Sequence, residues 1–179
     1  MGSNSEESGA ILTVGHSTHP LEEFIRLLKD NGVTLVTDVR SVPRSRHNPQ
    51  FNRETLPLAL NEARIGYIHF PELGGWRRPR SDSVNLGWHS PGFRGYADYL
   101  DTQEFALNLA ALASLARRNR VAVMCAEAAP YRCHRSLIAD ALTVQGFRVE
   151  HILSSGQRRP HRLTPFARVE NGRLTYPAL

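Results

Sequence analysis

Cysteine and lysine are nearly absent from this 179-residue chain, which has two cysteines and a single lysine, Lys29. Two cysteines are too few for the disulfide framework of a small secreted domain. A chain of this length does not need such a framework, because it can bury about two-thirds of its unfolded surface. In a reducing compartment we expect the two thiols to be free, metal-bound or catalytic, although their closeness in the sequence also allows a redox-formed disulfide.

Long apolar runs and nucleotide-binding fingerprints are also missing. No segment approaches the roughly 20 apolar residues needed to cross a bilayer, and residues 1–9 are polar with no signal-peptide core. We therefore expect a cytoplasmic protein with no membrane partner, in which residues 1–9 form a disordered lead. The sequence has no glycine-rich Walker loop, dinucleotide fingerprint or nucleophile-elbow motif, which argues against an ATPase, a Rossmann oxidoreductase and an ordinary serine hydrolase.

Positive charge is concentrated in one part of the chain. The formal net charge is +5. Residues 40–94 contain nine arginines and four acidic residues, so this segment carries the whole excess. The planar fork of arginine suits bidentate contact with phosphate or carboxylate. The clustering therefore predicts a local anion-binding surface.

Short apolar runs typical of buried strands alternate along the chain with stretches that have helical spacing. This alternation predicts a single α/β domain, residues 10–179, with a mostly parallel five-stranded sheet flanked by helices. An Asn171-Gly172 pair predicts a C-terminal β-hairpin, and a long loop insertion is expected at about 71–95. The five expected strands cover residues 11–14, 35–39, 67–70, 121–125 and 148–153.

Polar residues directly follow four of the expected strands. Open parallel sheets bind ligands in the crevice beyond the carboxyl ends of their strands, so we expect these residues to meet at one site. The four segments are Gly15-His16-Ser17, Asp38-Val39-Arg40-Ser41, Pro71-Glu72-Leu73-Gly74-Gly75 and Cys125-Ala126-Glu127.

The loop from Cys125 to Cys133 holds both thiols and leads into an expected helix. The positive end of a helix dipole favours a thiolate, and exposed backbone amides favour a bound anion. Either cysteine is a candidate nucleophile, and Glu127 or His134 is a candidate proton-transfer group. Cys125, Cys133 and His134 are also candidate ligands for zinc or iron, although their spacing matches no known finger or ribbon.

Arginines in and around this loop are expected to hold the anion of a ligand. The alternative is that Cys133 is simply a buried apolar residue and that Arg135 pairs with Asp38 or Glu127. A further segment near Trp76 interleaves aromatic and basic residues, which is typical of stacking on bases and equally of a lid over the crevice. The candidate ligand-binding residues are His16, Ser17, Asp38, Arg40, Arg44, Arg46, His69, Gly74, Gly75, Trp76, Arg132 and Arg135.

The order of these motifs resembles that of the bacterial family known as domain of unknown function 488. The resemblance spans most of residues 11–153. It implies a compact α/β domain with these motifs as its hallmark, and it implies no settled activity. The motifs are Thr13-Val14-Gly15-His16-Ser17, Asp38-Val39-Arg40-Ser41-Val42-Pro43, Tyr67-Ile68-His69-Phe70-Pro71-Glu72-Leu73-Gly74-Gly75, and Cys125-Ala126-Glu127 with Cys133-His134-Arg135.

We therefore predict a thiol- or metal-dependent hydrolase or transferase that acts on a phosphate-bearing ligand, either a nucleotide or a nucleic-acid segment. Two other functions fit the same residues. One is a non-catalytic nucleic-acid-binding module with structural or metal-binding cysteines, whose binding would depend strongly on salt. The other is a redox sensor that uses a reversible disulfide between Cys125 and Cys133.

Overall fold

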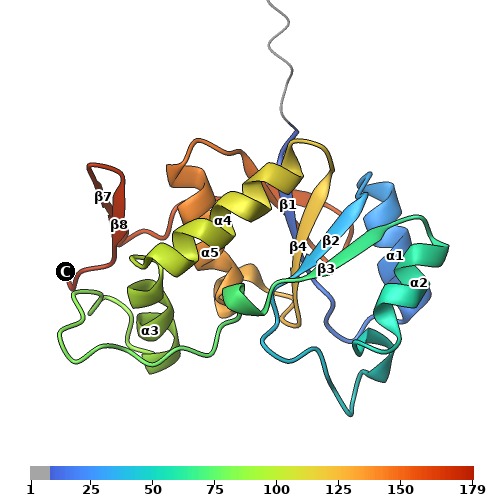
Figure 1. The fold of residues 1–179 in the computed structure, drawn as a ribbon, viewed down its shortest axis with the longest axis horizontal. Helices are drawn as coiled ribbons and strands as arrows, with labels where there is room; N and C mark the ends of the chain where they lie inside the picture. The colour runs from blue at the N-terminus through green and yellow to red at the C-terminus, as the bar shows by residue number, and fades with distance from the viewer. Residues whose placement is uncertain (1–8) are drawn as a thin grey trace, which may run out of the picture.

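Five parallel strands and one antiparallel edge strand form a single sheet in the computed structural model, which describes residues 9–179 (Figure 1). The strand order is β3-β2-β4-β1-β5-β6, and the predicted α/β architecture with a mostly parallel sheet is confirmed. The sixth strand was not predicted: the basic stretch around Arg159 pairs antiparallel with β5. The strands are β1 Ile11–Gly15, β2 Leu35–Asp38, β3 Gly66–His69, β4 Val121–Cys125, β5 Val149–Ile152 and β6 Arg158–Pro160.

The two central strands, β1 and β4, are buried along their whole length. Their sequences are mostly apolar because helices cover both faces of a parallel sheet. Their pairing places Gly15 opposite Cys125, and the pairing of β2 with β4 places Asp38 opposite Met124. This register brings the polar residues that follow these strands to the same edge of the sheet.

Helices form a layer on each side of the sheet. Figure 1 shows α1 and α2 on the right of the strands and α3, α4 and α5 on the left. Alternate residues of β4 serve the two layers: Met124 packs into the core with α1 and α2, and Val123 packs into the core with α4 and α5. The helices are α1 Leu21–Asp30, α2 Leu56–Glu62, α3 Pro91–Tyr99, α4 Gln103–Ala116 and α5 Arg135–Val144.

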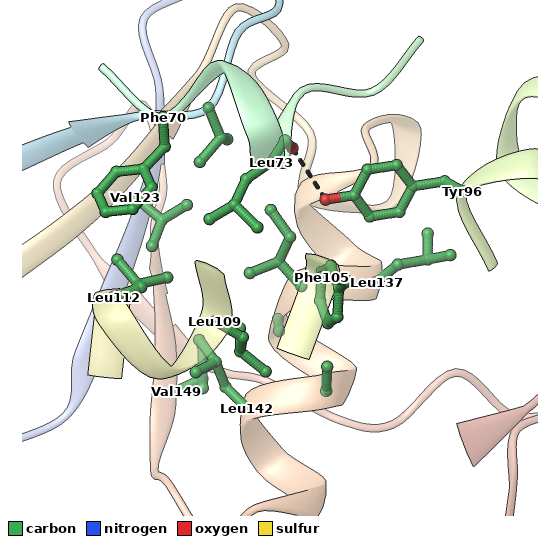
Figure 2. Close-up of a cluster of buried hydrophobic side chains, with 14 of the residues drawn as sticks. Phe70, Leu73, Tyr96, Phe105, Leu109, Leu112, Val123, Leu137, Leu142 and Val149 are labelled. Carbon is green, nitrogen blue, oxygen red and sulfur yellow. Dashed lines mark hydrogen bonds between the residues drawn. The ribbon is translucent and has the colours of Figure 1, made fainter. Parts of the chain in front are cut away.

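The larger core lies between the sheet and α4 and α5 (Figure 2). Side chains of β4, α4 and α5, among them Val123, Leu112 and Leu137, meet there and are fully buried. The hydroxyl of Tyr96 in α3 donates a hydrogen bond to the carbonyl of Leu73 at 2.8 Å. This bond holds the chain after β3 against the core, next to the site described below.

The predicted loop at 71–95 is shorter in the structure. Its first residues form a 3-10 helix, Pro71–Leu73, and α3 begins at Pro91. Proline suits the first position of a helix, because its fixed φ is already helical and its missing N–H has no partner there. The predicted C-terminal hairpin is present as β7, Arg168–Glu170, and β8, Arg173–Thr175.

The predicted lead, residues 1–9, lies outside the described residues except for Gly9. In the part of the chain that is described, every helix is too short or too polar to span a membrane.

Candidate functional site

A cavity of about 750 Å³ lies beyond the carboxyl ends of β1 and β4. The chain leaves β1 toward β2 and leaves β4 toward β5, on opposite sides, so this position is a topological switch point where parallel sheets bind ligands. Most of the predicted site residues line the cavity: His16, Ser17, Arg40, Arg44, Gly75, Trp76, Cys125, Glu127, Arg132, Cys133 and His134. Asp38, Arg46, His69, Gly74 and Arg135 do not.

Gly15, at the end of β1, allows the loop after β4 to cross directly over it. A Cβ atom at this position would lie 1.8 Å from the carbonyl oxygen of Glu127. The backbone N–H of His16 donates to the carbonyl of Cys125 at 2.9 Å across the same gap. Glycine is therefore required here for the close approach of two backbones.

The two thiols lie side by side beneath the cavity. Cys125 and Cys133 are both free and buried, with 2% and 7% of their surface exposed. The neighbouring Cys133 thiol lowers the pKa of Cys125, because it favours the Cys125 thiolate. The Cys125 sulfur, together with burial, raises the pKa of Cys133 well above its ordinary value. Cys125 is therefore the thiolate-prone member and Cys133 the one that keeps its proton.

A buried arginine sits against this pair. The Arg135 side chain is 1% exposed, and its Nη2 donates to the carbonyls of Glu127 and Ala128 at 3.2 and 3.3 Å. Its Nε and Nη1 have no hydrogen-bond partner among residues 9–179, nor does any carboxylate there form an ion pair with it. An uncompensated buried charge is costly, and the Arg135 charge also lowers the pKa of Cys125. A thiolate at Cys125 is thus favoured beside this cation.

His134 contacts the Cys133 thiol through its ring. Its Nε2 lies 3.0 Å from the carbonyl oxygen of Val39 and must donate to it, so Nδ1 carries the lone pair. That Nδ1 is 3.4 Å from the Cys133 sulfur. Burial lowers the pKa of His134 to about 4, which keeps the ring neutral near pH 7. A Cβ atom on Gly75 would approach Nδ1 to 2.6 Å, so the glycine turn packs directly on this ring.

Arg40 is a predicted anion-binding residue, but Asp38 accepts hydrogen bonds from most of its guanidinium edge. Its Nε and Nη2 donate to the two carboxylate oxygens at 2.9 and 2.7 Å, and Nη2 also donates to the carbonyl of Phe51. The fourth contact is from Nη1 to Nε2 of His16 at 3.3 Å. Arg40 therefore reaches the cavity only with its Nη1 edge, and Asp38 lies beneath it, completely buried.

Three other predicted residues, of which only His16 lines the cavity, make contacts within the fold. His16 donates from Nδ1 to the carbonyl of Ser17 at 2.8 Å and stacks on Phe51 with ring centroids 4.3 Å apart. Burial lowers the pKa of His16 to about 4. His69 lies outside the cavity, where its Nε2 contacts the carbonyl of Arg40 at 2.7 Å. A Cβ atom on Gly74 would lie 2.3 Å from the Ser41 hydroxyl, so Gly74 also serves packing.

The predicted basic and aromatic segment is only partly available to a ligand. Trp88 packs against Phe93, Phe166 and Tyr176 in place of facing solvent. Four of the nine clustered arginines have partners within the chain: Arg40 pairs with the buried Asp38, Arg77 lies over the Tyr99 ring, Arg94 donates to the carbonyl of Trp88, and Arg80 forms an exposed pair with Asp82. Trp76, in contrast, is 88% exposed at the cavity mouth.

Cys125, Cys133 and His134 were the candidate ligands for zinc or iron. Within residues 9–179, no three histidine, cysteine, aspartate or glutamate side chains are arranged to hold a metal ion. The reason lies in His134, whose Nε2 is used by the Val39 carbonyl and whose Nδ1 faces the Cys133 thiol. Cys125, Cys133 and His134 therefore do not converge on one point.

Sequence reasoning missed several polar residues of the cavity wall. Ser45 and Asn48 line it from the loop after β2, between Arg40 and α2. Their only sequence signal was membership of the proline-stiffened loop that also carries Arg44, because hydroxyl and amide residues in loops are too common to indicate a site.

Comparison with known proteins identifies a family and no closer relative. The family model described as Domain of unknown function DUF488 matches residues 20–142, which is more than half of the chain. No curated protein and no solved structure matches this chain. The matched residues contain β2, β3, β4 and both thiols of the cavity.

Proposed function

The chain belongs to the DUF488 family, and we propose that it is a thiol-dependent transferase or hydrolase that binds a phosphate-bearing ligand in the cavity beside Cys125. One observation carries this proposal: the pKa of Cys125 is lowered by the Cys133 thiol and by the buried, incompletely paired Arg135. Lowered thiol pKa values in partly enclosed, electropositive surroundings are typical of cysteine nucleophiles.

The two thiols have different roles in the proposed reaction. The Cys125 sulfur attacks the electrophilic centre of the ligand and forms a covalent bond as the leaving group departs. Cys133, which keeps its proton near neutral pH, donates it to the leaving group. Glu127, which is exposed at the cavity rim, then takes a proton from the water or acceptor, whose nucleophilic atom attacks the covalent intermediate and breaks its bond to the Cys125 sulfur. Cys125 departs as a thiolate, and the proton held by Glu127 returns to Cys133.

In this proposal, the anionic group of the ligand is bound by arginines whose side chains have no ion-pair partner among residues 9–179. Arg44 and Arg132 are exposed and line the cavity from two different loops. Their planar forks suit phosphate oxygens, and Ser45 and Asn48 add neutral hydrogen-bonding groups. The exposed ring of Trp76 at the mouth offers a stacking surface, which favours a ligand with a base, such as a nucleotide.

Alkylation by iodoacetamide as a function of pH, read by intact mass spectrometry, tests the nucleophile. We expect one thiol, Cys125, to react first with a midpoint below the ordinary thiol value of 9.0. The Cys133→Ala variant should move that midpoint upward, since it removes the thiol that favours the Cys125 thiolate. Two thiols that react alike, with ordinary midpoints, would refute the proposal.

Protection of Cys125 from alkylation tests the ligand. Inorganic phosphate and a nucleoside monophosphate should slow the reaction, and Arg44→Gln or Arg132→Gln should weaken that protection about tenfold, the loss of one charge-assisted contact. Arg46→Gln is the matched control, because Arg46 is exposed on the same loop as Arg44 and does not line the cavity. Equal effects of the Arg44 and Arg46 variants would exclude specific anion binding in the cavity.

A redox sensor is the second candidate, and the contact between two free thiols is the observation that favours it. It predicts that mild peroxide joins Cys125 to Cys133 rapidly and that a thiol reductant restores both. The nucleic-acid-binding module has less support, because four of the clustered arginines and Trp88 are engaged within the fold.

A further inference from the structure

A second cavity, of about 710 Å³, lies on the other side of the loop that joins β4 to α5. Cys133 and Arg132 of this loop line the first cavity, whereas Tyr131 and Ser136 line the second. The two cavities have no lining residue in common. The second one is thus a separate feature that the proposed thiol chemistry does not use.

The floor of the second cavity is a buried chain of hydrogen bonds. His151 contacts the Thr13 hydroxyl at 2.6 Å and Nδ1 of His161 at 2.8 Å, and Nε2 of His161 donates to Asp140 at 2.7 Å. With the Asp140 carboxylate as the terminal acceptor, every ring nitrogen has a partner when both imidazoles are neutral. Burial lowers the pKa of His151 to about 3, in keeping with a neutral ring.

These hydrogen bonds keep the Asp140 carboxylate away from the cavity surface. Asp140 is completely buried behind His161, and its carboxylate also accepts hydrogen bonds from the hydroxyls of Thr164 and Tyr176 at 2.7 and 2.8 Å. No acidic residue of the described chain lines the cavity itself, whereas Arg159 and Arg162 do, and both are exposed. The lining therefore carries positive charge only.

The walls of the cavity are aromatic. Trp88, Tyr131 and Phe166 line it together with prolines. Trp88 stands edge-on to Phe166, with ring centroids 4.9 Å apart. Flat apolar walls and two arginines together specify complementary features in a ligand: a ring and an anionic group.

We propose that this cavity binds a small aromatic anion, a planar ring that carries a phosphate or carboxylate group. The ring lies between Trp88 and Tyr131, and the anionic group lies at the mouth between the guanidinium groups of Arg159 and Arg162. The volume of the second cavity is within the range of cavities that enclose small organic ligands. The proposal does not depend on the reaction proposed for Cys125.

The position of the two tryptophans allows each cavity to be observed alone, because the chain has only Trp76 and Trp88, one at each cavity. In the Trp76→Phe variant, intrinsic fluorescence reports the second cavity through Trp88. We expect phenyl phosphate and benzoate to change this fluorescence in a saturable way. Benzyl alcohol, which has the ring without the charge, should bind at least tenfold more weakly.

The arginines supply the decisive variants. R159Q/R162Q should weaken phenyl phosphate binding at least tenfold, whereas R118Q/R168Q, which removes two exposed arginines outside the cavity, should leave it unchanged. Circular dichroism checks that each variant is folded. No saturable signal from Trp88, equal binding by R159Q/R162Q, or a signal seen only from Trp76 in the Trp88→Phe variant would each overturn the proposal.

Discussion

The guanidinium of Arg40 and the carboxylate of Asp38 form a buried, two-point ion pair at the end of β2, with N–O distances of 2.9 and 2.7 Å. The backbone N–H of Arg40 and the hydroxyl of Tyr67 donate further hydrogen bonds to the same carboxylate, at 3.1 and 2.5 Å. Because the Arg40 backbone leads into the loop that carries Arg44, this pair positions one wall of the first cavity.

Removal of the acidic partner should destabilise the protein strongly. Asp38→Asn leaves the buried Arg40 charge uncompensated, which costs about 3–5 kcal/mol of unfolding free energy when one partner of a buried pair is lost. Urea denaturation measures this change. Asp82→Asn is the control, because the Arg80–Asp82 pair is exposed and such pairs contribute about 0–1 kcal/mol. Equal losses in the two variants would mean that the Asp38 pair does not stabilise the fold.

Buried neutral histidines should make the protein acid-sensitive. His134 has a pKa of about 4 in the folded chain and an ordinary value of 6.5 when unfolded. Between these values the unfolded chain binds a proton that the folded chain does not, so stability is full above pH 6.5 and falls toward pH 4. This one group contributes a loss of about 2 kcal/mol between pH 8 and pH 5. His16 and His151, also lowered, add losses in the same direction.

Urea denaturation at a series of pH values checks this prediction. His134→Gln keeps a donor for the Val39 carbonyl and removes the titrating ring, so its stability should fall by about 2 kcal/mol less over the same range. His89→Gln, at an exposed position, is the control and should follow the parent protein. A His134→Gln profile that is parallel to the parent profile would contradict the assignment.

Gly15 should not tolerate a side chain. Gly15→Ala places a methyl group 1.8 Å from the Glu127 carbonyl, so the loop that carries the thiols must move. We expect a loss of about 3 kcal/mol, as for overpacking at a rigid backbone contact, and an altered alkylation midpoint for Cys125. Gly92→Ala in helix α3 is the control: its Cβ would lie 3.8 Å from the Ser90 hydroxyl, and stability should stay within about 1 kcal/mol. Wild-type stability and reactivity in Gly15→Ala would contradict the close approach.

Local patterns were sufficient to predict most of the fold. Short, mostly apolar runs such as those of β1 and β4 alternate with helical patterns, which predicted a mostly parallel sheet covered on both faces. The short edge strand β6 escaped prediction, since its sequence is basic and proline-containing and its conformation depends on pairing with β5. The same limit applies to α3, whose helical residues 91–95 had been assigned to the long loop.

By itself, the sequence determined that a polar rim lies at the carboxyl ends of the strands and that Cys125, Glu127, Cys133 and His134 share one loop of it, because these residues are close along the chain. Tertiary structure alone decided which arginines are available to bind a ligand. Arg40 and Arg135 are buried while Arg44 and Arg132 face the cavity, and the sequence presents all four in similar surroundings. It also decided that Cys125, and not Cys133, is the thiolate-prone member. Burial, hydrogen-bond partners and charge pairing arise from segments that are distant in the chain, so no local pattern records them.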